Sequence, residues 1–159
     1  MNFETEIIAE NAVEAGAQIG NTLLLLLPIT ENDDRALADL RLVAIDESRY
    51  FVQVFLTIFK ELGSGGYDEL QKALPALNYG AALGAYGMLP SKSEFFYKYG
   101  FVVRELDLID GAQGFALALL DALDIIREQN TAVYDVVAAL ASGALTYEDA
   151  VNSGIISAL

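Results

Sequence analysis

The segment Tyr50–Phe59 reads YFVQVFLTIF. Its aromatic and β-branched residues are typical of a buried strand. However, no glycine or proline separates it from the residues before it, whose apolar positions recur at helical spacing. Gly63 follows at the position where such a helix would end. We therefore predict a central hydrophobic helix near residues 50–62, apolar nearly all round, with a buried strand over residues 50–59 as the alternative.

Helical spacing also extends outward from this segment in both directions. Apolar residues recur every three or four positions over residues 3–27 and 33–62, so they share one face of each expected helix. Pro75 divides residues 67–88 into two shorter expected helices, because proline is tolerated in a first helical turn. Most of the first half of the chain is therefore expected to be helical.

Start and stop signals place further helices in the second half. Ser91 has a glutamate three residues later, which is the spacing of a capping box and predicts the start of a helix. We expect longer helices over residues 102–128 and 132–142. Thr146 and Gly154 have the residue types that begin and end a last short helix.

These patterns together predict an all-α fold. We expect a single domain over residues 1–159, a bundle of five to seven helices around the central helix near residues 50–62. The length of 159 residues agrees with one domain, since domains most often have ~100–150 residues.

Composition excludes several classes of site. The chain has no cysteine and no histidine, which excludes disulfide frameworks, thiolate metal sites and imidazole-based catalysis. It also lacks the glycine-rich phosphate-binding loops and the Gly-x-Ser-x-Gly elbow of hydrolases. We therefore expect no cofactor and no enzymatic activity.

The charge is strongly acidic. Nine basic and 23 acidic residues give a formal net charge of −14. Such a chain repels phosphate backbones and anionic membrane surfaces, so we expect no nucleic-acid partner and no membrane partner. The acidity agrees with three interpretations: solubility of an apolar chain, mimicry of DNA, or adaptation to high salt.

The sequence predicts no export. The first 14 residues contain four glutamates and no basic residue, unlike a signal peptide. The longest apolar run, Leu23–Ile29, has seven residues, against the ~20 that span a bilayer. We expect a cytoplasmic protein or a component of an assembled particle.

Two Asp-x-x-Asp pairs are the candidate metal ligands: Asp107 with Asp110, and Asp121 with Asp124. Residues three apart lie on one side of a helix, and a turn between the pairs would bring four carboxylates together. Such oxygen ligands suit Mg²⁺ or Mn²⁺. The alternative, which we favour, is the solvated face of one amphipathic helix.

Small residues and an apolar tail indicate a subunit interface or close packing within the chain. Glycines at near-helical spacing would let two helices approach closely, and the chain ends on an apolar pentapeptide. The candidate interface residues are Gly16, Gly20, Gly80, Gly84, Gly87, Ile155, Ile156 and Leu159.

Five aromatic residues lie between Phe95 and Phe101, beside Lys92 and Lys98. Core or interface packing is the default interpretation, since aromatic side chains bury large areas. A small aromatic or lipid-like ligand is the alternative.

The function predicted from these features is non-catalytic. We expect a structural or interaction protein that acts in a homo-oligomer or larger assembly, such as a viral or phage particle. Its partners would be other copies of itself or other protein subunits. The alternatives are a divalent-metal-dependent hydrolase that uses the Asp pairs and an acidic DNA-mimic inhibitor.

Overall fold

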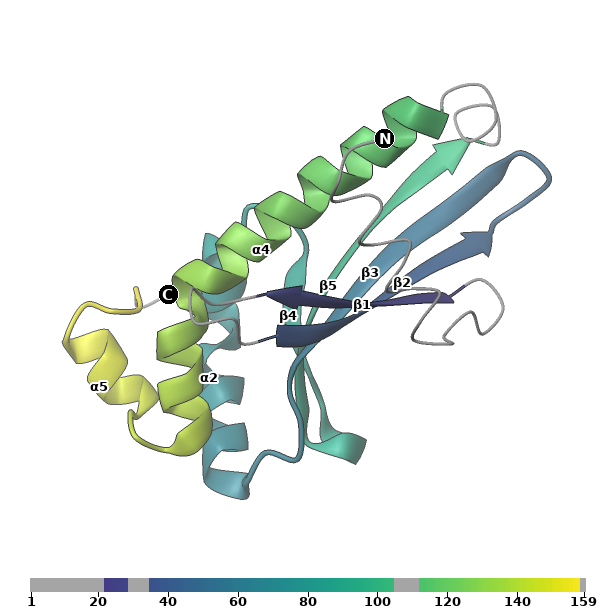
Figure 1. Cartoon of the computed structure of the whole chain (residues 1–159). Coiled ribbons are helices and arrows are strands. Elements are labelled where there is room, and N and C mark those ends of the chain that lie inside the picture. The colour runs from purple at the N-terminus through teal and green to yellow at the C-terminus, as the bar shows by residue number, and fades with distance from the viewer. Residues whose placement is uncertain (1–21, 29–34, 105–111, 158–159) are drawn as a thin grey trace.

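The computed structural model describes residues 22–28, 35–104 and 112–157, and shows a mixed α/β architecture (Figure 1). Five antiparallel strands form one sheet in the order β1-β2-β3-β5-β4. The elements in chain order are β1 Thr22–Pro28, β2 Arg35–Ala44, β3 Arg49–Phe59, α2 Ser64–Gly80, β4 Ala85–Leu89, the 3₁₀ turn η1 Pro90–Lys92, β5 Glu94–Arg104, α4 Ala112–Ser142 and α5 Tyr147–Asn152.

The predicted all-α bundle around a central helix near residues 50–62 is therefore wrong. Residues 49–59 are β3, the central strand of the sheet. Val52, Val54 and Leu56 are buried while the residues between them are half-buried, which is the period of two that a strand imposes. The aromatic and β-branched composition indicated the correct structure, and the missing breaker misled the prediction.

A turn without glycine or proline separates β2 from β3. Asp46 accepts a hydrogen bond from the backbone N–H of Ser48 at 3.0 Å, and Arg49 Nε donates to its other carboxylate oxygen at 2.7 Å. The bond from Arg49 is the main cause that lowers the pKa of Asp46 to about 2. This aspartate turn reverses the chain direction without a glycine or proline.

Other local predictions are also wrong after β3. Residues 64–80 form one helix that contains Pro75, rather than two short helices. The expected helix start at Ser91 is a single 3₁₀ turn that leads into β5. The two helices expected over residues 102–128 and 132–142 are wrong: residues 102–104 belong to β5, and Ala112–Ser142 form the single helix α4. Two local predictions are confirmed: α4 ends at Ser142, and the hydroxyl of Thr146 caps α5 by accepting the N–H of Asp149 at 3.1 Å.

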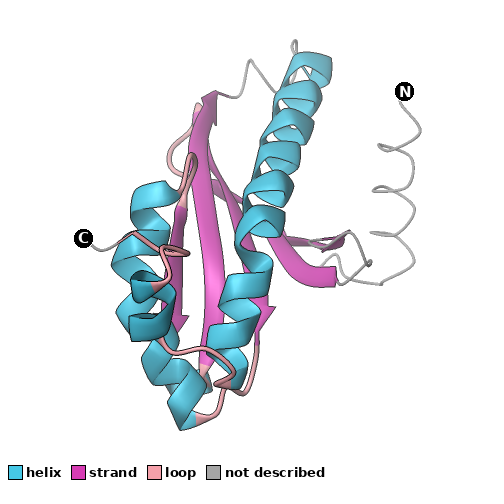
Figure 2. Cartoon of the chain, turned by 90° about the vertical axis from the view of Figure 1, so that its left-hand side faces the viewer, coloured by secondary structure: helices cyan, strands magenta, loops and turns pink. Residues whose placement is uncertain are grey.

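The connection β3–α2–β4 is a split crossover. Both β3 and β4 pair antiparallel with β5, so they run parallel to each other with β5 between them. The helices α2, α4 and α5 gather on one side of the sheet (Figures 1 and 2). The core lies between these two layers, and its largest fully buried residues are Tyr97, Phe95, Leu56, Leu70, Ile126 and Leu140.

Candidate functional site

The candidate site is the face of the sheet that points away from the core, here called the outer face. Side chains alternate along each strand, so the residues between the buried ones of β2, β3 and β5 point away from the helices. Its members on these three strands are Asp39, Arg41, Val43, Arg49, Phe51, Gln53, Phe55, Thr57, Glu94, Phe96, Lys98, Gly100, Val102 and Arg104.

Aromatic rings make the middle of the outer face apolar and flat. The rings of Phe55 and Phe96 stack with centroids 4.5 Å apart. The ring of Phe51 lies over Gly100, where an added Cβ would overlap it, and the ring of Phe96 lies over Gly87 of β4 in the same way. Glycine at these two positions lets the rings lie against the strand backbone, so they do not stand up from the sheet.

The outer face is basic, although the chain as a whole is acidic. Four of the nine basic residues occupy its strand positions and are exposed: Arg41, Arg49, Lys98 and Arg104. Against them stand two acidic residues, Asp39 and Glu94. Arg41 pairs with Asp39 on the same strand, and Arg49 pairs with Asp46 in the turn.

The helix layer has the opposite character. Its described helices carry eight acidic residues and two basic ones. Both basic residues pair with a neighbour on the same helix, Lys72 with Glu69 at 2.6 Å and Arg127 with Asp124 at 3.3 Å. Negative charge is therefore concentrated on the helix layer, while the outer face is basic and apolar.

The strand register arranges the outer face in rows that run across the sheet. Residues opposite each other on neighbouring strands fall in one row. From β2 through β3 to β5, the rows are Val43–Phe51–Val102, Arg41–Gln53–Gly100 and Asp39–Phe55–Lys98. The third row places an acidic and a basic residue on either side of a central ring.

Two of the four predicted metal ligands lie within the described residues. Asp107 and Asp110 lie outside the described residues. Asp121 and Asp124 are exposed on α4. Within the part of the chain that the structure describes, no group of three or more His, Cys, Asp or Glu residues could hold a metal ion.

The predicted interface residues are dispersed. Gly80 ends α2, Gly84 lies in the following turn with a φ of +63°, and Gly87 lies in β4, so these three cannot form a ladder on one helix. In the tail, Ile156 is buried in the chain's own core and Ile155 is 52% exposed. Gly16, Gly20 and Leu159 lie outside the described residues. An interface role for these residues stays a prediction.

Sequence reasoning missed the outer face because it assigned its strands to helices. The signal that could have found it is the alternation in the aromatic cluster of β5. Phe95 and Tyr97 are fully buried, whereas Phe96 between them faces outward and Lys98 is exposed. The aromatic cluster therefore contributes side chains to both faces of the sheet.

Comparisons with protein-family models, with curated proteins and with solved structures found no match to this chain. Among the residues that the structure describes, the helices lack a stretch that is long and apolar enough to cross a membrane.

Proposed function

We propose that the protein is a non-catalytic interaction protein that assembles through its outer face, and that the partner is a second copy of the chain. The observation that carries this proposal is the row Asp39–Phe55–Lys98. An acidic and a basic residue at equal distances from a central apolar residue form a pattern that can be complementary to itself.

The complementarity follows from a two-fold axis. Two outer faces can pack about an axis that runs along β3 between the sheets, as in a β-sandwich. β2 of each copy then lies over β5 of the other copy. Asp39 of one copy therefore faces Lys98 of its partner, and Phe55 faces Phe55.

The other rows agree with the same axis. Val43 and Val102, which are 49% and 55% exposed, would cover each other. Arg41 would lie over Gly100, where the ring of Phe51 covers the backbone and offers a face for a guanidinium group. Apolar residues of one copy thus face apolar residues of the other, and the long side chain of Arg41 faces the partner's glycine, which leaves room for it.

The charge distribution favours contact through the outer faces over contact through the helix layers. Two copies with a formal charge of −14 each repel one another over long range. Contact through the basic outer faces keeps the acidic helix layers on opposite sides of the dimer. Three strands ~4.8 Å apart and ~10 residues long give a footprint of about 14 Å by 34 Å. This is below the ~800 Å² per partner of a standard interface, so we expect a dimer with a dissociation constant on the order of micromolar.

The experiment is a charge exchange across the proposed axis, measured by sedimentation velocity. Asp39→Lys places two cations opposite each other, and Lys98→Asp places two anions there, so each single change should weaken the dimer at least tenfold. The double variant Asp39→Lys with Lys98→Asp restores opposite charges and should recover most of the affinity. The matched control is Lys92→Asp, an exposed residue in η1 that lies off the outer-face strands.

Two results would overturn the proposal. One is a wild-type chain that sediments as a monomer at 100 µM. The other is a double variant that is no better than either single variant while all chains keep the same circular dichroism.

One observation favours a second candidate function, an acidic DNA mimic. Acidic residues gather on one layer of the molecule, and α4 carries exposed Asp121, Asp124, Glu128 and Asp135. Replacing these four by their amides should abolish binding to a polylysine probe if the layer acts as a polyanion. Unchanged binding would exclude α4 from that role.

A further inference from the structure

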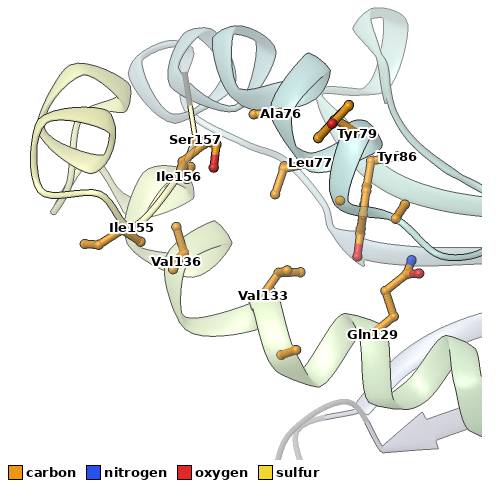
Figure 3. Close-up of a pocket in the computed structure, with 13 residues that line it drawn as sticks. Ala76, Leu77, Tyr79, Tyr86, Gln129, Val133, Val136, Ile155, Ile156 and Ser157 are labelled. Atoms are coloured by element: carbon orange, nitrogen blue, oxygen red, sulfur yellow. The ribbon is translucent and has the colours of Figure 1, made fainter. Parts of the chain in front are cut away.

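A cavity of about 210 Å³ lies between α2, α4 and the tail that follows α5 (Figure 3). Leu77 contributes from α2, Val133 and Val136 from α4, and Ile156 from the tail. These side chains project into the space in Figure 3 and make its walls apolar. The cavity lies on the helix side of the sheet, away from the outer face.

One hydroxyl proton in the wall has no acceptor. The Tyr86 side chain extends from β4 into the cavity wall and is only 5% exposed. Its hydroxyl donates no hydrogen bond within the described residues, and the amide of Gln129 lies near enough to act on it only as a donor. Burial raises the pKa of Tyr86, so the hydroxyl keeps its proton at neutral pH. A buried donor without an acceptor normally has a reason, such as a bound ligand.

The neighbouring Gln129 cannot accept this proton. Its Oε1 atom already accepts the N–H groups of Ala82 at 2.7 Å and Leu83 at 3.2 Å, which uses both lone pairs. The remaining N–H of its amide can only donate. The carbonyl of Leu83 is also saturated, because it accepts from Tyr97 and from Gln129 Nε2 at 3.3 Å.

We propose that this cavity binds a small neutral molecule with an apolar body and one hydrogen-bond acceptor, which takes the proton of the Tyr86 hydroxyl. A carbonyl or ether oxygen satisfies the donor. A carboxylate does not fit, because no basic side chain lines the cavity and the chain has a large negative charge.

The volume limits the size of the ligand. A dry apolar cavity of ~150 Å³ holds benzene. The volume of the present cavity exceeds that value by roughly the volume of one small substituent. A single ring that carries a carbonyl group therefore fits it.

The tail supplies one wall of the cavity. Gly154 takes a φ of +72°, and the N–H groups of Ile155 and Ile156 bond to the carbonyl of Ala150 at 2.9 and 3.1 Å. This helix-ending turn places Ile156 inside and leaves Ile155 half-exposed. A ligand would therefore enter beside residues 155–157.

The experiment uses acetophenone as the probe and α-methylstyrene as its matched analogue, which replaces the carbonyl oxygen by a methylene group. Binding is followed by amide chemical-shift changes during titration of the full-length chain. Wild-type protein should prefer acetophenone, and Tyr86→Phe should weaken acetophenone about tenfold while it leaves α-methylstyrene unchanged. Benzoate should not bind.

A second variant tests the place of binding. Ala76→Leu fills the cavity from α2 with a residue that favours helix, so it should abolish the shifts caused by both neutral probes. Equal binding of acetophenone to wild type and Tyr86→Phe would overturn the role of the hydroxyl. Binding that survives Ala76→Leu, or shifts that are absent in the folded wild type, would overturn the site.

Discussion

The side chain of Asn78 forms two hydrogen bonds with the backbone of Tyr86. Asn78 Nδ2 donates to the carbonyl of Tyr86 at 3.1 Å, and Asn78 Oδ1 accepts its N–H at 2.6 Å. Tyr86 lies in β4, whose only paired neighbour in the described sheet is β5. The amide of a helix residue thus occupies the backbone groups that another strand would use, and it blunts this edge against unwanted pairing.

Asn78→Leu should therefore destabilise the chain and promote aggregation. The change leaves a partly buried N–H and carbonyl without partners, which costs about 2–3 kcal/mol in unfolding free energy. Urea unfolding and light scattering measure the two effects. Asn152→Leu, at an exposed position of α5, is the control and should change neither. Equal effects of the two variants would contradict the role of Asn78.

Tyr86 and Tyr97 provide a matched pair of hydroxyl deletions. The rings contact each other edge to face at 5.2 Å, and both are buried. The Tyr97 hydroxyl donates to the carbonyl of Leu83, whereas that of Tyr86 donates no hydrogen bond within the described residues. Tyr97→Phe should cost about 1 kcal/mol, and Tyr86→Phe should be neutral or stabilising in the absence of ligand. Chemical unfolding of both variants checks this, and a reversed order would contradict it.

The same residues predict a loss of stability at alkaline pH. Burial raises the pKa of Tyr97 to about 12 and also raises that of Tyr86, while an unfolded tyrosine titrates near ~10. The stabilisation is complete below pH ~10, where both states hold the proton, and it is lost as the pH rises from there through about 12. Unfolding midpoints measured from pH 8 to 12 should fall, and Tyr97→Phe should fall less steeply. Parallel curves would argue against this assignment.

Asp121→Asn combined with Asp124→Asn should leave the unfolding free energy within about 0.5 kcal/mol of wild type, since both residues are exposed and the pair Asp124–Arg127 is a surface ion pair. Mg²⁺ should not raise the melting temperature of either chain. If Mg²⁺ raised the melting temperature of wild type but not that of the double variant, the result would support the metal-dependent hydrolase instead.

The ends of the helical half were predictable because their signals are local. Thr146 caps α5 through its own hydroxyl, and Gly143 and Gly154 adopt the positive φ that ends a helix. These signals do not depend on distant parts of the chain. The start at Ser91 failed, although its residues match the capping pattern, because the strand β5 that follows pairs with both β3 and β4.

The sheet was not predictable by spacing alone. Residues such as Phe51, Phe55 and Ile58 recur at helical steps, yet in β3 they belong to both faces of a strand that is apolar on each side. Such a strand lacks the polar alternation that marks a strand with one solvated face. The outer face could not be predicted for a second reason. Its rows join residues up to 59 positions apart in the sequence, such as Asp39 and Lys98, which lie on either side of Phe55.

The central claim is that two copies pack outer face to outer face about an axis along β3. The chain has no cysteine, so one introduced cysteine reports only its own contacts. Thr57 lies on β3, where the axis would place it opposite Thr57 of the partner. Packed sheets lie ~10 Å apart, so a bis-maleimide crosslinker of that reach is needed. Thr57→Cys should form covalent dimers, and Glu128→Cys on α4 should not. Absence of dimers with Thr57→Cys, or equal yields from both variants, would contradict the claim.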